Sequence, residues 1–447
     1  MVIQTHLQKN RRVKLSDVIS TFIDMFFIVL TMLVVFFTPD NIESLPLIGY
    51  FIIGLSLYLC FKVREKDKLL FLFAIVGFIN ISIGVTDCIN KGLNVASWQI
   101  PLRESEYNAF TAKSILLFLS VLNVFLSKSW IRKVIEIKDQ NSSRMNNVLI
   151  GYLGAAAMYI ILIMGYSGDV TSTSTYVSNS NPLIEYAVII YAVVWLYAGK
   201  SKILNFLLKM YTLLYIFYSF YYGDRSAAFL MILLYYLLYF GNKIRLSSTK
   251  IIILAVFAIT LSNFIAGYRS GMSLDLTSII ENSTQRGVYS DTVSYSYYAS
   301  ITISAVHHID NTFIYFFEYL KTIILGGSSS EFGNIANYVK ENYLYNVGGG
   351  LYTSYFYFGF GFLGVILGAA VLGITIRLVY SRRGSLAMIY QILIPVLSIR
   401  WYLYGPTTLY RSVFVISTVL LFVCIIFDKL VRKQMVKKNR SCKHLLL

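Results

Sequence analysis

The sequence contains little charge for its length. Only 14% of its 447 residues are Asp, Glu, Lys or Arg, whereas soluble domains carry roughly 25%. Hydrophobic residues make up 57% of the chain, and the mean hydropathy is +0.64. A soluble protein of this composition lacks the polar residues to cover its surface, so a soluble enzyme is excluded. A disordered chain is excluded too, because disorder requires low hydrophobicity.

Cysteine is also scarce. The chain has four cysteines. Cys60 and Cys424 lie inside apolar runs, Cys442 lies in the basic tail, and Cys88 lies between runs. They form neither a CxxC pair nor a Cys/His cluster, so neither a disulfide framework nor a metal site is indicated. No metal and no cofactor is expected.

The hydrophobic residues are concentrated in runs of about 17–25 residues, the length of a helix that crosses a bilayer core of ~30 Å. They predict an all-α polytopic membrane protein with about twelve transmembrane helices. The predicted spans are residues 17–38, 45–62, 69–86, 110–127, 147–165, 182–198, 203–221, 226–240, 251–267, 352–376, 385–399 and 412–427. The first run is expected to be a span and not a signal peptide, because it is too long and no small-residue cleavage site follows it.

Basic residues outnumber acidic ones by 39 to 22, but their distribution does not indicate nucleic-acid binding. Most lysines and arginines lie in alternate loops and in the tail, and most acids lie in the other loops. The positive-inside rule therefore places both termini in the cytoplasm. The predicted organisation is nine spans within residues 1–267, a large outer loop at 268–351, three spans within 352–428 and a basic cytoplasmic tail at 429–447.

The outer loop at 268–351 is long for a compact protein, and such loops are usually functional or disordered. It is rich in aromatic and β-branched residues, which need something to pack against. We expect a folded cap of interfacial helices on the membrane mouth. Within it, residues 307–325 carry apolar residues at the spacing of one helix face. The alternative is a lid without chemistry.

Arginines occur near outer helix ends, where the positive-inside rule makes basic residues unusual. They are Arg225, Arg269, Arg400 and Arg411, with Arg286 following in the cap. Arginine presents a planar fork that holds phosphate oxygens bidentately, whereas lysine is a point charge. Arg225 also begins a predicted helix, where free N–H groups favour anions. An anionic ligand would explain these arginines. The alternative is snorkelling with local acid partners such as Asp224.

Other polar residues lie near the same face or inside the spans. His307 and His308 lie in the cap, where an imidazole near a phosphate site can serve as a general base. The alternative is a pair of solvated surface residues. Asp24 lies on a polar stripe of the first span and is expected to face the bundle. Either a site role or an interhelical hydrogen bond would explain it.

Three consecutive glycines, Gly348, Gly349 and Gly350, precede the tenth predicted span. Glycine permits positive φ and close backbone approach, and successive N–H groups can form an anion nest. Further glycines within the span at 352–376 are expected to permit close helix packing.

Several short motifs follow one another in a fixed order. GDRS at 223–226 starts a span in the middle of the chain, YR at 268–269 precedes the long loop, and GGGL at 348–351 precedes a glycine-rich span. With a dozen spans and one large late loop, these features resemble the Wzy-type oligosaccharide repeat-unit polymerases, also called O-antigen polymerases. The resemblance covers roughly residues 180–430 and lies in layout and short motifs.

The resemblance implies a glycosyltransferase of GT-C-like architecture that needs no metal. It implies a substrate of undecaprenyl-diphosphate-linked oligosaccharide at the periplasmic face of the bacterial inner membrane, and a chain-length regulator as a protein partner. Related O-antigen ligases carry a histidine in their large loop. Whether His307 or His308 corresponds to it stays open.

These observations combine into one mechanistic expectation. A hydroxyl of a new repeat unit attacks the anomeric carbon of the growing glycan, and the lipid diphosphate leaves. Arg225, Arg269 and Arg411 are expected to hold the diphosphate, with Arg286 and Arg400 second. His307 or His308 is the preferred base, and Asp224 or an acid of the cap is the alternative. Tyr295, Tyr297 and Tyr298 are expected to line the sugar path. A flippase for the same lipid-linked oligosaccharide, or a ligase, remains the competing function.

Overall fold

The computed structural model is helical throughout the part of the chain that it describes, with no strand there. It describes residues 15–86, 88–90, 100–135, 147–166, 181, 183–241, 289–309, 312–325, 334–342 and 349–444, and isolated positions between 253 and 281. Seven of the described helices are long and apolar enough to cross a membrane, and four shorter helices are apolar. The chain therefore has the character of a polytopic membrane protein, as the hydropathy predicted.

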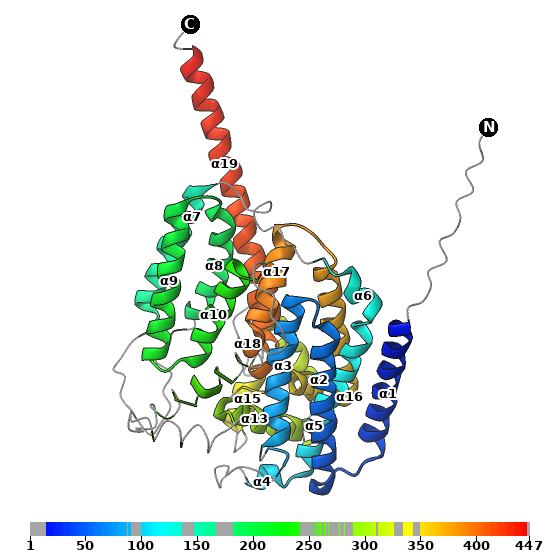
Figure 1. Cartoon of the computed structure of the whole chain (residues 1–447). Coiled ribbons are helices and arrows are strands. Elements are labelled where there is room, and N and C mark those ends of the chain that lie inside the picture. The colour runs from blue at the N-terminus through cyan, green and yellow to red at the C-terminus, as the bar shows by residue number, and fades with distance from the viewer. Residues whose placement is uncertain are drawn as a thin grey trace, which may run out of the picture.

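The first group of helices builds one side of the bundle (Figure 1). It consists of α1 (Leu15–Phe37), η1 (Ile42–Ser44), α2 (Leu45–Val63), α3 (Asp67–Val85), α4 (Ile100–Arg103), α5 (Glu106–Phe125) and α6 (Lys128–Lys133). A second group, on the other side, consists of α7 (Val148–Met164), α8 (Leu183–Ala198), α9 (Lys202–Tyr221) and α10 (Arg225–Tyr239). These helices match eight of the predicted spans. The ninth, at 251–267, lies almost entirely outside the described residues.

The C-terminal part links the two groups. It contains α13 (Asp291–Ile309), α14 (Thr312–Leu325), α15 (Ile335–Asn342), α16 (Tyr352–Tyr380), α17 (Ser385–Val396), α18 (Ser398–Leu403), the π-helix η4 (Thr408–Ile416) and α19 (Ser417–His444). Helix α17 packs against α3 of the first group and against α8 and α10 of the second. In Figure 1, α1 begins and α19 ends at the same end of the bundle, and α13 and α15 lie at the other end.

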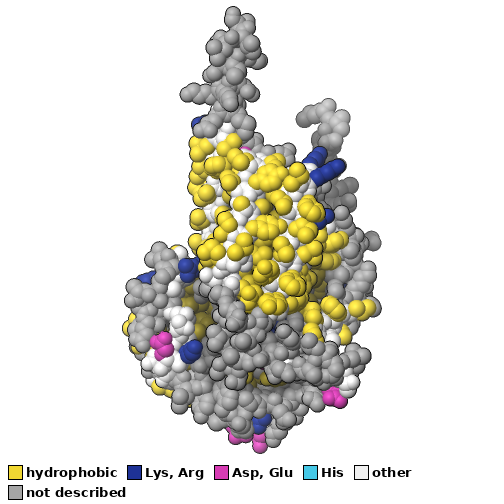
Figure 2. Space-filling model, turned by 90° about the vertical axis from the view of Figure 1, so that its left-hand side faces the viewer, with side chains coloured by type: hydrophobic (Ala, Val, Ile, Leu, Met, Phe, Trp, Pro, Cys, Tyr) yellow, Lys and Arg dark blue, Asp and Glu magenta, His cyan; other side chains and the backbone are white. Residues whose placement is uncertain are grey.

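The outward faces of the bundle are apolar. On α9 the exposed residues Ile203, Phe206, Leu213 and Phe217 recur at helical spacing, whereas Leu204, Leu208, Tyr211 and Tyr215 between them are fully buried. Figure 2 shows one face of the molecule, on which hydrophobic side chains form a broad band. In water such a band would be unfavourable, whereas in a bilayer it contacts acyl chains at no cost.

The described residues between 289 and 342 include α13, α14 and α15, and α13 packs against α3, α5 and α16. Its small polar residues permit this close packing, and Ser304 hydrogen-bonds to Thr111 of α5 at 3.0 Å. Tyr297 and Tyr298 are fully buried, and the Tyr297 hydroxyl donates to Asn108 Oδ1 at 2.6 Å. The expectation that these two tyrosines line a sugar path is therefore wrong. Tyr295 alone of the three remains exposed.

The predicted helix face over 307–325 falls in two described helices. Ile309 ends α13 and Thr312 begins α14, and Asp310 and Asn311 lie outside the described residues.

Helix α16 reverses direction at Phe360 and Gly361, where Gly361 has a φ of 60°. The Tyr352 hydroxyl donates to the Gly368 carbonyl at 3.0 Å, although a straight helix would separate these residues by about 24 Å. The chain thus folds back, and residues 352–359 pack beside the longer segment after the turn. The sequence predicted one continuous span over 352–376. The long segment instead starts near residue 361, because glycine adopts the positive φ of the turn without a Cβ penalty.

Two buried lysines attach α1 to the rest of the bundle. Lys62 of α2 donates to Asp24 of α1 at 2.7 Å and to Asn123 of α5 at 2.7 Å. Near the other end of α1, Lys113 of α5 donates to the Thr38 carbonyl and to Asp40. Asp24 thus faces the bundle, as predicted, and joins α1 to α2.

Replacing Asp24 with alanine is expected to destabilise the protein by about 3–5 kcal/mol, because Lys62, with its side chain only 2% exposed, loses its countercharge. The double variant Asp24→Ala/Lys62→Met is expected to recover most of that loss, because it removes both charges. Thermal unfolding in detergent measures both variants, with Glu43→Ala, which removes an exposed carboxylate, as the control. An equal loss in the single and double variants would contradict the ion-pair explanation.

Candidate functional site

Five charged side chains form two ion-paired groups, joined by the neighbouring residues Asp224 and Arg225, at the end of the bundle where α13 lies. Four elements supply them: Glu185 is in the first turn of α8, Asp224 is the N-cap of α10 and Arg225 its first residue, Asp291 begins α13, and Arg400 lies in α18. We call this set the arginine–carboxylate cluster. Each residue stands at a helix end or in a short helix, which brings polar side chains to the margin of the apolar bundle.

Arg225 binds the first residue of α13. Its Nη2 donates to both carboxylate oxygens of Asp291, at 2.8 and 3.0 Å. The Arg225 side chain is 10% exposed and that of Asp291 is 32% exposed. The guanidinium of Arg225 is therefore more buried than the carboxylate of Asp291, which is partly exposed on the surface.

Arg400 has charged neighbours but few hydrogen bonds. Its Nε lies 2.9 Å from Glu185 Oε1 and its Nη2 lies 3.7 Å from Asp224 Oδ1. The N–H at Nε is not aligned with the carboxylate, and within the described residues this buried nitrogen has no hydrogen-bond partner. The guanidinium also lies over the Tyr404 ring at 5.4 Å. Arg400 is therefore held by the charges of two carboxylates, and its Nε is buried against Glu185.

The side chain of Asp224 caps the N-terminus of α10. Its Oδ1 accepts from the Ala227 N–H at 3.1 Å and from the Ser226 hydroxyl at 2.8 Å. The sequence predicted that this N-terminus attracts an external anion. The structure fills that place with an internal carboxylate, which satisfies the same N–H groups.

The cluster as a whole has one more carboxylate than guanidinium. Arg411 is a further arginine that the sequence assigned to the same face. It is half-buried in η4, which packs against α8 and α18, and no described carboxylate lies within ion-pair distance of it. π-Helical segments such as η4 are rare in proteins, and those that occur are often found at functional sites. Arg269 and Arg286 lie outside the described residues.

His307 and His308 lie at the other end of α13. Nδ1 of His307 lies 2.9 Å from the Phe358 carbonyl, to which it donates, and its Nε2 faces Gly361 at the turn of α16. His308 stacks on Phe110, and its Nε2 lies 3.0 Å from the Tyr357 hydroxyl. The pKa of His308 is lowered, first by burial and then by the neighbouring His307.

The structure does not bring the histidines together with Arg225. Sixteen residues of α13 separate His307 from Asp291, which corresponds to about 24 Å along the helix. No side chain spans that distance. Among the described residues, the acids Asp224 and Asp291 lie beside Arg225, whereas the histidines do not.

The glycines before α16 serve packing. The Gly350 N–H donates to the Leu403 carbonyl at 3.1 Å, so this amide is not available to an anion. A Cβ on Gly350, whose φ is 137°, would lie 2.7 Å from Ile303. Gly349 also has a positive φ and lies against Tyr404. Gly348 lies outside the described residues.

Sequence reasoning missed Glu185 and included Asp291 only as one of the acids of the predicted cap. The sequence could have identified Glu185, because it is a charged residue at the start of an apolar run, as Arg225 is. Among the described residues, no three His, Cys, Asp or Glu side chains are grouped as metal ligands. No family model, curated protein or solved structure matches the chain.

Proposed function

We propose that the chain is a polymerase that joins undecaprenyl-diphosphate-linked oligosaccharide repeat units into O-antigen or a related polysaccharide, at the periplasmic face of the bacterial inner membrane. The observation that carries this proposal is the arginine–carboxylate cluster. Two guanidinium groups from distant parts of the sequence meet three carboxylates at a bundle margin. Transfer from a diphosphate leaving group to a hydroxyl needs both kinds of group.

The reaction assigns a role to each group. The acceptor hydroxyl oxygen bonds to the anomeric carbon, and its proton passes to a carboxylate, for which Asp291 is the most suitable. The bond between the anomeric carbon and the diphosphate oxygen breaks, and the electron pair stays on the diphosphate. Arg400, with Arg225 and Arg411, stabilises that charge in a low-dielectric margin.

A flippase is the runner-up, since it too needs anion-binding arginines among many helices. Transporters built from repeats show broken helices at corresponding positions in two halves. Here the reversal lies in α16, whereas α1, α2, α3 and α5 are uninterrupted. This asymmetry favours the polymerase.

A deletion strain tests the function directly. Loss of a polymerase leaves lipopolysaccharide with core plus a single repeat unit, because transfer to the core continues without extension. Core without any repeat unit would instead indicate a ligase or a flippase. Complementation with the wild-type gene is expected to restore long chains, which controls for effects on neighbouring genes.

The orientation has its own test. In a variant without native cysteines, a cysteine at exposed Asn342 is expected to react with a membrane-impermeant thiol reagent added outside, and one at exposed Ser381 is expected to react only after permeabilisation. The charge distribution over the loops is the reason. The reverse labelling pattern would overturn the orientation and, with it, a periplasmic site.

A further inference from the structure

Helix α9 carries a lysine inside its apolar span. This helix, Lys202–Tyr221, is long and apolar enough to cross a membrane. Lys209 lies seven residues after its first residue, or about 10 Å along the helix axis, and its side chain is exposed, as is that of Lys202. A charge at this depth is costly in hydrocarbon and marks a functional position by default. The polymerase proposal gives Lys209 no role.

Both lysines lie on the outward face of α9. Residues 202, 206, 209, 213 and 217 follow one another at spacings of three and four, so they share one side of the helix. On this side Phe206 is 61% exposed, Leu213 63% and Phe217 64%. The outward face thus carries two cations toward its start and an uninterrupted apolar strip beyond them.

The helices around the two lysines supply no countercharge. Helices α7, α8 and α10 pack against α9. Neither α9 itself nor α7 or α10 contains an aspartate or a glutamate. The acid of α8, Glu185, lies in its first turn, in the arginine–carboxylate cluster, and this cluster adjoins the opposite end of α9, since Asp224 follows Tyr221 closely. Within the part of the chain that the structure describes, the lysine pair therefore carries two unbalanced positive charges.

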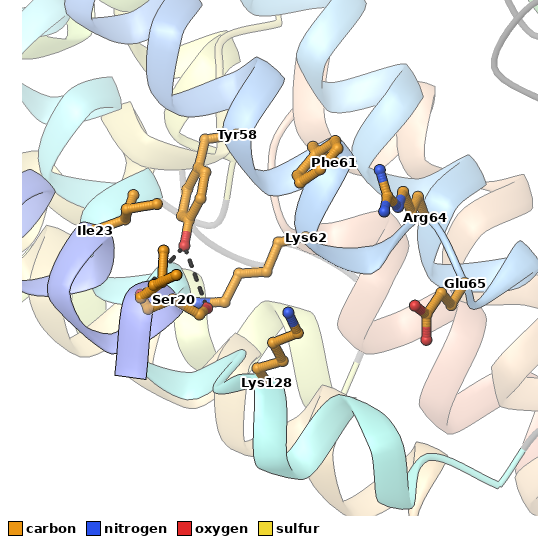
Figure 3. Close-up of a pocket in the computed structure, with 9 residues that line it drawn as sticks. Ser20, Ile23, Tyr58, Phe61, Lys62, Arg64, Glu65 and Lys128 are labelled. Atoms are coloured by element: carbon orange, nitrogen blue, oxygen red, sulfur yellow. Dashed lines mark hydrogen bonds between the residues drawn. The ribbon is translucent and has the colours of Figure 1, made fainter. Parts of the chain in front are cut away.

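Other basic residues in the bundle have acids beside them. A cavity of about 210 Å³ between α1, α2 and the start of α6 is lined by Lys62 and Lys128 but also by Glu65 (Figure 3). Lys62 in addition donates to Asp24 at 2.7 Å. The lysine pair of α9 differs from this cavity in its excess of charge, which favours an anion.

The ammonium group of Lys209 lies near the margin of the apolar layer. It is 6.0 Å from the centroid of the Tyr239 ring. Tyr239 ends α10, and its hydroxyl donates to Asn205 Oδ1 at 3.4 Å, one turn before Lys209. Side chains on a helix lean toward its N-terminus, and a long lysine side chain reaches the interface in this way. The charge thus stands at the level of lipid headgroups, beside a tyrosine of the kind common at that level.

The cations and the apolar strip together select the chemistry of the ligand. A free inorganic anion uses only the lysines and leaves Leu213 and Phe217 without a role. A zwitterionic lipid head brings its own cation toward the two lysines. A lipid with a net negative head and an apolar tail uses both parts of the face, and juxtamembrane lysines attract such lipids.

We propose that Lys202 and Lys209 bind the phosphate headgroup of an anionic phospholipid, with an acyl chain lying along Leu213 and Phe217. The lipid neutralises both lysines at the margin of the bundle. This site lies at the end of α9 opposite the arginine–carboxylate cluster and is independent of the reaction proposed there.

Native mass spectrometry of the purified full-length protein with phosphatidylglycerol or phosphatidylcholine measures this binding. Phosphatidylglycerol is expected to bind the wild type more tightly than phosphatidylcholine. The variant Lys202→Gln/Lys209→Gln is expected to bind phosphatidylglycerol about 30-fold more weakly, from roughly fivefold per lysine. The charge-preserving variant Lys202→Arg/Lys209→Arg is expected to keep most of the affinity, which separates loss of charge from loss of folding.

The matched control is Lys321→Gln/Lys340→Gln, which removes two exposed lysines of α14 and α15 and is expected to bind phosphatidylglycerol like the wild type. Wild-type affinity in the glutamine variant of α9 would overturn the proposal, as would equal binding of phosphatidylcholine and phosphatidylglycerol by the wild type. Displacement of phosphatidylglycerol by millimolar inorganic phosphate alone would reassign the lysines to a free anion and refute the lipid.

Discussion

Arg400→Lys is expected to lower the rate of chain extension by about 10²–10³-fold, while the protein still inserts in the membrane. Lysine keeps the positive charge beside Glu185 and Asp224 but loses the planar fork, including the Nε donor that has no hydrogen-bond partner among the described residues. Removing a donor that stabilises charge in a transition state costs ~2.7–4 kcal/mol in a well-studied oxyanion site. The rate is measured with purified protein and lipid-linked repeat units.

The matched control is Arg103→Lys, which changes an arginine of α4 that lies beside Glu104 and outside the cluster. It is expected to extend chains at the wild-type rate. If Arg400→Lys also gives wild-type rates and chain lengths, Arg400 serves only to hold α8 and α18 together, and the assignment of the diphosphate to this cluster is wrong.

Asp291→Asn is expected to lower the same rate by about 10²–10⁴-fold, the usual contribution of a positioned general base. Asn keeps the shape of the side chain but cannot accept the proton. His308→Gln, at the far end of α13, is expected to change the rate by less than about tenfold, since about 24 Å of helix separates it from the cluster. Comparison of the two variants decides between the acid and the histidine as base.

Asp291 also pairs with Arg225, so a structural role has to be separated from a chemical one. Added formate supplies a small carboxylate and is expected to restore part of the activity of Asp291→Asn if the residue acts as a base. The double variant Arg225→Gln/Asp291→Asn removes the ion pair as a whole. Recovery of activity in the double variant, or loss of activity with His308→Gln alone, would contradict the assignment of Asp291.

The arginines show what can be predicted from the sequence alone. Arg225 and Arg400 stood out because basic residues are unusual at outer helix ends, and the structure brings these two into one cluster through Asp224. Asp224 was expected as a local acid partner, but Glu185 and Asp291 could not be assigned as partners, because they belong to segments far from Arg400 and Arg225 along the chain. The ion pairs depend on how α8, α10, α13 and α18 converge, and hydropathy contains no information on that packing.

For His307 and His308, proximity to Asp291 in the sequence does not mean proximity in the structure. His307 and His308 follow Asp291 closely in the sequence, and a loop would allow all three into one site. The helix α13 is rigid and rises about 1.5 Å per residue, so it holds them at opposite ends. The sequence indicated that this segment is ordered, but the direction and length of the helix decide which side chains can cooperate.

The sequence by itself determined the helical, membrane-protein character of the chain, the approximate place of eight apolar helices, and that Asp24 faces the bundle. These properties follow from local composition, since a run of apolar residues is stable as a helix in a bilayer whatever its neighbours are. Only the tertiary structure decided that α16 turns back at Gly361 and that the Gly350 N–H donates to the Leu403 carbonyl. It also decided which three carboxylates pair with the two arginines. Each of these depends on contacts between residues distant in sequence, where close packing and pairing of buried charge select one arrangement.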